Sequence, residues 1–229
     1  MQVELSKSPG HPFHPLPIGA IAQPATWPNY TALALPSVEQ LISLALNVGL
    51  CLEPAPASSL PVHAWRALGQ LGVTTAIAPL VSLLSLPAIA PVHQELPYVF
   101  SYFGPAAVAD LAAVLINARQ PLVGRLTACH ALSLVGRNHF AATHDCVTHL
   151  SAQLGKALVN PTRLNAALVE GLIELAAIEA VPVLRRAFSN RRVDTSVTGN
   201  WLSVQARLGL ISYSQWQEQK KGAELSAPF

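Results

Sequence analysis

A short apolar phrase recurs four times in this chain, and it constrains the fold more than any other feature. Each copy has five residues and ends in leucine: AIAPL at 76–80, AVADL at 107–111, CVTHL at 146–150 and AVPVL at 180–184. The closing leucines are 31, 39 and 34 residues apart, which is the period of helical-hairpin repeats. A single helix pair cannot bury its apolar face alone, so repeats of this length stack on one another. The recurrence predicts an all-α fold, an α-solenoid of about four helical hairpins.

Proline content divides the chain into an arm, a repeat region and a tail. Residues 1–36 are rich in proline, which fixes φ and removes a backbone donor, and we expect an extended or disordered Pro-rich arm there. Ser37 is a favourable helix N-cap, and the helix that it begins, over 37–49, is expected to cap the stack. The repeats fill the rest of a domain over 37–215, and residues 216–229 form a polar tail.

Glycines mark the expected ends of the first helix in successive hairpins. Gly72 and Gly104 each follow an apolar helical stretch, at the position where glycine favours helix termination. A third stretch ends at Gly136. We expect a longer link from Arg137 to Ala142 before the next helix begins.

The composition raises the question of a membrane protein, because 51% of the residues are apolar and only 11% are charged. The best candidate for a span, residues 80–90, is far shorter than the roughly 20 apolar residues that a transmembrane helix needs. The N-terminal sequence has neither the apolar run nor the cleavage site of a secretory signal. Three cysteines without paired spacing are typical of reduced, buried side chains. These observations predict a cytoplasmic protein without a membrane segment.

The stretch from His63 to about Leu210 is similar to bacterial HEAT-like repeat proteins, of the group labelled after phycobilisome-lyase repeats. The phrases that carry the resemblance are HAWRALGQLG with AIAPLVSLL, HQELPYVFSYFGPAAVADL, LVEGLIELAAIEAVPVLRRAF and RVDTSVTGNWLSVQARLGL. The resemblance implies HEAT-like hairpins and a subgroup that has no established activity. Lyases of this superfamily attach bilins to antenna proteins, so the resemblance also introduces a holder of a small prosthetic group as an alternative function.

Equivalent positions in the repeated phrase indicate a candidate binding surface. The residue before the closing leucine is, in chain order, Pro79, Asp110, His149 and Val183. Stacked helices bring such positions side by side, about 10 Å apart. Asp110 and His149 are therefore expected to form a polar ridge on the second-helix face, with Arg185 and Arg186 nearby. That face is generally the concave one in helical solenoids, and a ridge of mixed charge suits a protein or peptide partner.

Metal binding and catalysis are not favoured by the residue patterns. Cys146 and His149 are three residues apart on an expected helix, but zinc requires four such ligands. Cys146 also takes the place that alanine holds in the other copies of the phrase, which indicates a core position. No nucleophile-elbow phrase or phosphate-binding glycine loop is present. We therefore assign no catalytic, cofactor-binding or metal-binding residues, and expect a structural hydrogen bond between His63 and Glu95, which lie at one expected helix junction.

The charge distribution leaves a second alternative open. Residues 1–110 contain two basic and five acidic side chains, whereas residues 111–229 contain twelve basic and seven acidic ones. Four arginines lie within 185–192 and could contact a nucleic-acid backbone, although no basic stripe crosses successive repeats. We therefore expect a non-catalytic protein-binding scaffold, an adaptor or assembly factor, and keep the prosthetic-group holder and the nucleic-acid binder as alternatives. A closed pocket would favour the holder and an open groove the adaptor. The partner and the oligomeric state stay open.

Overall fold

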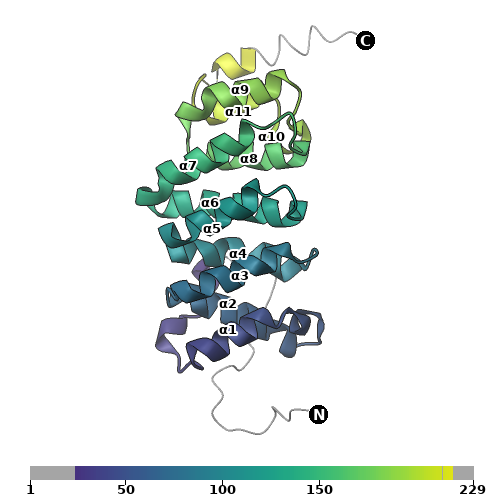
Figure 1. Cartoon of the computed structure of the whole chain (residues 1–229). Helices are drawn as coiled ribbons and strands as arrows, with labels where there is room; N and C mark the ends of the chain where they lie inside the picture. Colours follow the sequence, from purple (N-terminus) through teal and green to yellow (C-terminus); the bar gives the residue numbers. More distant parts are fainter. Residues whose placement is uncertain (1–23, 213, 219–229) are drawn as a thin grey trace.

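The computed structural model describes residues 24–212 and 214–218, and all regular structure in them is helical, as predicted. Turns of 3-10 helix connect or extend the α-helices, which follow one another along the length of the molecule from α1 to α9 (Figure 1). The α-helices, in chain order, are α1 Val38–Leu46, α2 Leu60–Gln70, α3 Ile77–Ser82, α4 Ala90–Phe103, α5 Val108–Ile116, α6 Leu122–Asn138, α7 Phe140–Leu154, α8 Thr162–Glu174, α9 Val181–Ser189, α10 Thr195–Thr198 and α11 Trp201–Arg207.

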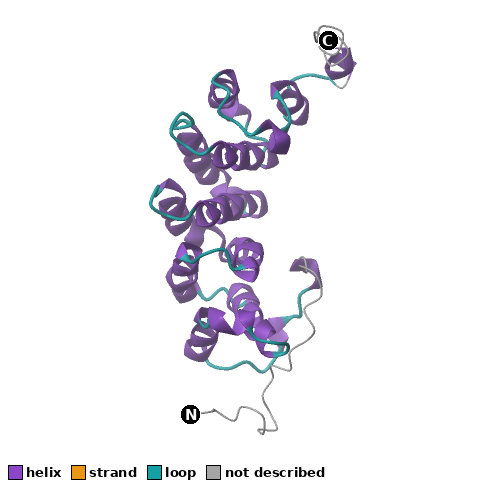
Figure 2. Cartoon of the chain, turned by 90° about the vertical axis from the view of Figure 1, so that its right-hand side faces the viewer, coloured by secondary structure: helices purple, strands orange, loops and turns teal. Residues whose placement is uncertain are grey.

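The longer helices lie in two rows. Helices α2, α4, α6 and α8 contact one another in chain order and form the first row. Helices α3, α5, α7 and α9 do the same and form the second row, which α1 extends at its N-terminal end. Many of these helices are seen end-on in Figure 2, where the two rows stand beside each other. The result is a stack of helix pairs in which each pair contacts chiefly its neighbours in the chain.

The repeated phrase supplies the contact between the rows. Its four closing leucines are all buried, with exposed fractions of 1% or less: Leu80, Leu111, Leu150 and Leu184. They belong to one continuous apolar core that includes Leu96 and Leu132 from the first row. A fully buried leucine contributes about 1.5–3 kcal/mol to stability through the hydrophobic effect, so each copy of the phrase anchors one layer of the stack.

Helix boundaries follow the local sequence signals in most places. The side chain of Ser37 accepts a hydrogen bond from the Gln40 backbone N–H, and the Gln40 side chain accepts one in return from the Ser37 N–H, which closes a capping box before α1. Gly72 and Gly104 end α2 and α4 with φ angles of +64° and +60°. These backbone conformations are left-handed, and only glycine adopts such positive φ angles at no steric cost.

The expected link from Arg137 to Ala142 is wrong. Helix α6 continues past Gly136 to Asn138, and His139 alone separates it from α7. Gly136 serves close packing instead, because a Cβ atom there would lie 2.9 Å from Leu175 and 3.0 Å from the Cβ of Cys146. The glycine permits α6 to approach its neighbours and does not terminate the helix.

The described part of the proline-rich arm packs against the stack. Residues 24–36 contain two 3-10 turns, Pro24–Thr26 and Tyr30–Ala32, where an extended or disordered chain was expected. Trp27 and Tyr30 are buried, with exposed fractions of 8% and 2%. Residues 1–23 of the arm, and the tail beyond residue 218, lie outside the described residues.

One described segment, Ala90–Ile116, is long and apolar enough to cross a membrane, with a mean hydropathy of 1.8. It consists of α4 and α5, which Gly104 separates with its positive φ angle. Most of the segment, 61% of its most apolar window, is buried inside the protein. Buried core helices commonly have this composition, so the segment is weak evidence for a membrane span.

Candidate functional site

The four predicted ridge residues lie on three neighbouring helices of the second row. Asp110 is on α5, His149 is on α7, and Arg185 and Arg186 are on α9. His149 is half-buried and the other three are exposed. Among the residues that the structure describes, no ion pair joins any two of them. The structure therefore aligns these residues along one row without bringing them into a connected polar site.

Two arginines of the 185–192 cluster have intramolecular contacts. The guanidinium carbon of Arg185 lies 6.0 Å from the ring centre of Trp201. Arg192 donates hydrogen bonds to the carbonyl oxygens of Ala157, at 3.3 Å, and Asn160, at 3.2 Å. Arg192 therefore stabilises the loop between α7 and α8, and the cluster does not present four unengaged guanidinium groups.

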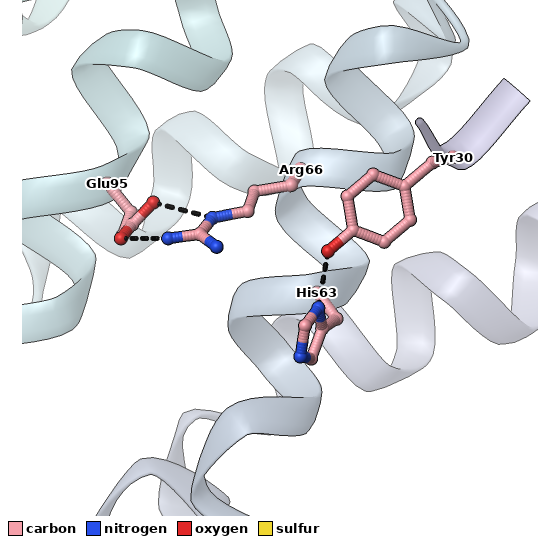
Figure 3. Close-up of polar contacts among 4 residues, drawn as sticks. All are labelled: Tyr30, His63, Arg66 and Glu95. Atoms are coloured by element: carbon pink, nitrogen blue, oxygen red, sulfur yellow. Dashed lines mark hydrogen bonds and ion pairs between the residues drawn. The ribbon is translucent and has the colours of Figure 1, made fainter. Parts of the chain in front are cut away.

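The predicted hydrogen bond between His63 and Glu95 is replaced by two other contacts at the same junction (Figure 3). Glu95 of α4 accepts hydrogen bonds from Nε and Nη2 of Arg66 in α2, at 2.9 and 2.6 Å. The Nδ1 atom of His63 is hydrogen-bonded to the hydroxyl of Tyr30. His63 and Glu95 are both buried beside the junction, but arginine, with its planar pair of donors, is the better partner for a carboxylate.

The side chains at this junction are buried, and their burial determines which of them are charged. The side chains of Arg66 and Glu95 are only 3% and 5% exposed, so each needs the other to compensate for lost hydration. Burial raises the pKa of Tyr30 to about 12, since an ionised phenolate would be poorly solvated there. Tyr30 is therefore neutral at physiological pH and available for its hydrogen bond with His63.

Trp27 holds the residue 24–32 segment on α2 and α4. Its ring stacks on Tyr102 of α4, with ring centres 5.5 Å apart, and the guanidinium carbon of Arg66 lies 4.9 Å from its centre. The backbone N–H of Tyr30 donates a hydrogen bond of 2.8 Å to the Gln70 side chain. A short segment is thus bound by one aromatic anchor and a backbone hydrogen bond, on the side of the first row that faces away from the second.

We refer to that side as the first-row face, and define it by Arg66, Tyr98, Tyr102, His130 and Arg137. Next to the docked segment it contains a cavity of about 420 Å³ between α4 and α6. The cavity is lined by Pro24, Tyr98, Ser101, Tyr102, Leu134, Arg137, Asn138 and His139. None of the residues lining this cavity was among the predicted site residues.

A signal for this face is present in the sequence as a constant spacing of 32 residues. Arg66, Tyr98 and His130 are 32 residues apart, and so are Gln70, Tyr102 and Leu134. Both series occupy equivalent positions on α2, α4 and α6, and the rings of Tyr98 and His130 meet edge to face with centres 5.8 Å apart. The repeated leucine of the apolar phrase identifies the core, whereas the 32-residue spacing identifies the first-row face.

The lining of the cavity includes the positively charged Arg137 and no acidic side chain. Arg137 is exposed and takes part in neither of the ion pairs formed by the described residues. His139 donates from Nε2 to the carbonyl oxygen of Ser101, at 2.6 Å, and this fixes its ring against the end of α4. Desolvation lowers the pKa of His130, and the nearby Arg137 adds to that shift while Glu174 opposes it. The cavity lining thus combines the aromatic rings of Tyr98 and Tyr102 with the guanidinium of Arg137.

Two of the three cysteines are core residues, whereas Cys51 is half-buried and not fully buried as expected. Cys129 and Cys146 have exposed fractions of 1% and 0%, which confirms the core position predicted for Cys146. Burial raises the pKa of Cys129 to about 12 and that of Cys146 to about 11, so both are thiols at neutral pH, whereas metal coordination and nucleophilic attack need the thiolate. Within residues 24–212 and 214–218, no group of three or more potential metal ligands is found.

Comparison with protein-family models, with curated proteins and with solved structures gives no match to this chain.

Proposed function

We propose that this chain is an α-solenoid of about four HEAT-like hairpins that serves as a non-catalytic scaffold, an adaptor or assembly factor that binds a partner protein. The two rows of helices, each in contact with its neighbours in chain order, support the solenoid interpretation. A stack of this kind offers long open faces, which suit polypeptide ligands better than small molecules.

The observation that carries the proposal is the docking of residues 24–32 on the first-row face. This segment belongs to the same chain, but it is held as a bound peptide would be, by Trp27 between Arg66 and Tyr102 and by a backbone hydrogen bond to Gln70. The face therefore has the aromatic surface and polar side chains that polypeptide recognition requires. Aromatic and arginine anchors of this kind dominate the energetics of protein interfaces.

The second-row ridge is the other candidate for the partner-binding surface. Asp110, His149 and Arg186 lie on successive helices, and an apolar cavity of about 440 Å³ lies between α7 and α9. It is lined by residues that include Val147, Pro182 and Val183 but contains no basic side chain except His144. We favour the first-row face because it combines aromatic walls, a guanidinium without an ion-pair partner among the described residues, and an example of a docked segment.

The two alternative functions receive less support. A prosthetic-group holder needs an enclosed apolar cleft, and three cavities among the described residues, with volumes of about 350–440 Å³, open to the surface. Nucleic-acid binding through the 185–192 cluster needs guanidinium groups free to reach phosphates, and Arg192 is committed to backbone carbonyls.

Affinity capture from a lysate of the source organism tests the proposal. The bait would be the wild-type chain, a ridge variant with Asp110→Arg, Arg185→Glu and Arg186→Glu, and a face variant with Arg137→Glu. Arg119→Glu, an exposed arginine in the turn after α5, is the matched control. A protein retained by the wild type and the control, lost by the face variant, and shown by calorimetry to bind after purification would support a scaffold that uses the first-row face. If only the ridge variant fails to retain the protein, the partner-binding site is on the second row. A wild type that retains no protein would contradict the scaffold.

A further inference from the structure

The Trp27 site has a structural equivalent one layer along the first row. Trp27 lies between Arg66 of α2 and Tyr102 of α4. Adding the 32-residue spacing to these two positions gives Tyr98 of α4 and Leu134 of α6. Both line the cavity of about 420 Å³, so the cavity is the next site in the series, between the next pair of helices.

The walls of this second site are suited to an aromatic side chain. The aromatic residues Tyr98 and Tyr102 line the cavity together with Leu134, which is buried. Tyr102 contributes to both sites, since one face of its ring stacks on Trp27 and its side chain also lines the cavity. Aromatic pairs in offset or edge-on geometry attract each other by more than the area that they bury accounts for.

The two sites differ in charge. At the Trp27 site, Arg66 is neutralised by Glu95 within the protein. At the cavity, Arg137 has no ion-pair partner among the described residues, and the lining contains no carboxylate. Asn138 adds an exposed amide beside it. A negatively charged group of a ligand would therefore provide the counter-charge that Arg137 lacks among the described residues.

We propose that the cavity between α4 and α6 binds an aromatic side chain of a partner polypeptide while an acidic side chain close to it in the partner's sequence pairs with Arg137. The proposal rests on the scaffold function above and names the chemistry of the partner. It predicts a partner segment with an aromatic and an acidic residue close together, seated beside Pro24, the residue of the docked segment that lines the cavity.

Peptide selection tests this chemistry directly, because it does not require the partner to be identified. A random peptide library displayed on phage is selected on the immobilised full-length chain, and the enriched peptides are synthesised with a fluorescent label. Binding is then measured by fluorescence polarisation for the wild type, Arg137→Glu and Arg137→Gln. Arg119→Glu and the ridge variant serve as controls, and far-UV circular dichroism verifies that each variant is folded.

The expected peptides contain Trp, Tyr or Phe next to Asp or Glu. Because charge-assisted hydrogen bonds are among the strongest in proteins, Arg137→Glu should weaken binding by about ten-fold or more. Arg119→Glu should change it by less than about two-fold, as expected for a screened surface charge. A peptide with lysine in place of its acidic residue should regain affinity for Arg137→Glu, and this charge exchange is a result that a structural role for Arg137 would not produce.

Three results would overturn the inference. The first is that the enriched peptides lack an aromatic or an acidic residue. The second is that the wild type and both Arg137 variants bind the peptides with equal affinity. Failure of the library to yield any binder would also overturn it. If affinity capture still identifies a partner in any of these cases, the scaffold function stands and only the assigned chemistry of the cavity fails.

Discussion

Two helix junctions each contain an arginine–glutamate ion pair, but the surroundings of the two pairs differ. One junction lies between α2 and α4, and the other between α8 and α11. At the first, Arg66 donates two hydrogen bonds to Glu95, at 2.9 and 2.6 Å. At the second, Arg207 donates two to Glu170, at 2.7 and 2.6 Å. The side chains of the first pair are 3% and 5% exposed, and those of the second are 42% and 27% exposed.

The difference shows how the docked segment changes the energetics of the stack. Trp27 lies over Arg66 and excludes water from the first pair, so each charge there depends on its partner. The second pair stays hydrated, and each charge can be solvated by water if its partner is lost. Two ion pairs with similar hydrogen-bond distances are therefore expected to differ in how much stability is lost when one partner is removed.

The largest expected effect is that of Glu95→Gln. The substitution preserves the size of the side chain but leaves the buried guanidinium of Arg66 without a counter-charge. Breaking one partner of a buried pair should lower the free energy of unfolding by about 3–5 kcal/mol. Urea denaturation followed by far-UV circular dichroism measures this. A loss below about 1 kcal/mol, typical of exposed pairs, would remove the distinction between the two junctions.

The glycines that follow α4 and α11 extend the same comparison. Gly104 has φ +60°, and a Cβ there would lie 2.9 Å from the ring of His139. Gly209 has φ +70° with no atom within 4 Å of its Cβ position. Gly104→Ala should therefore cost about 2–4 kcal/mol from backbone strain and overpacking together.

Gly209→Ala should cost only about 1–2 kcal/mol, since strain alone applies. The same denaturation experiment compares the two variants. Equal losses would mean that His139 moves aside freely, contrary to its hydrogen bond with the Ser101 carbonyl.

Local signals in the sequence were sufficient for the helical class and for the core, because both depend on near-neighbour patterns. The leucines at 80, 111, 150 and 184 are buried as the repeat required, and Ser37 caps α1. The error at Gly136 has a physical cause. A glycine is favourable both at a helix end and where two helices approach closely, and only the contacts with Leu175 and Cys146 distinguish the two roles.

The site was harder to predict, because its residues come together through contacts between distant segments. His63 and Glu95 were correctly placed at one junction, but the partner of Glu95 was an arginine three residues further along α2, on the next turn. Trp27 lies in a segment whose proline content indicated an extended arm, and nothing near it in sequence reveals its contact with Tyr102. The 32-residue spacing would have aligned Tyr98 with Arg66, but would not have shown that a cavity lies between α4 and α6.

The stability of the protein at high pH tests whether Tyr30 of the docked segment is buried. The pKa of Tyr30 is raised from 10.0 to about 12, so the folded state holds the phenolic proton more tightly than the unfolded state. Its contribution is fully present below pH 10 and is lost as the pH rises to about 12. This rise in the pKa corresponds to a loss of about 2–3 kcal/mol in the free energy of unfolding between pH 10 and pH 12.

At neutral pH, Tyr30→Phe should be less stable than the wild type by about 1 kcal/mol, because it lacks the hydrogen bond to His63. Between pH 10 and 12 the wild type should lose stability relative to this variant, because Phe has no proton to release. Denaturation at a series of pH values measures the difference. A constant difference across that range would show that Tyr30 is not desolvated, and would remove the reason for regarding the segment as firmly docked.

The smallest expected effect completes the comparison of the ion pairs. Glu170→Gln removes the partner of Arg207 at the hydrated junction, and the free energy of unfolding should fall by only about 0–1 kcal/mol. Raising the NaCl concentration from about 0.1 M to about 1 M shortens the Debye length from about 10 Å to about 3 Å. The small loss should therefore shrink further with salt, whereas the loss in Glu95→Gln should change little, because the buried pair is screened much less. If both losses declined equally with salt, water would have to reach Arg66 in the folded protein, and Trp27 could not be the cover that distinguishes the two junctions.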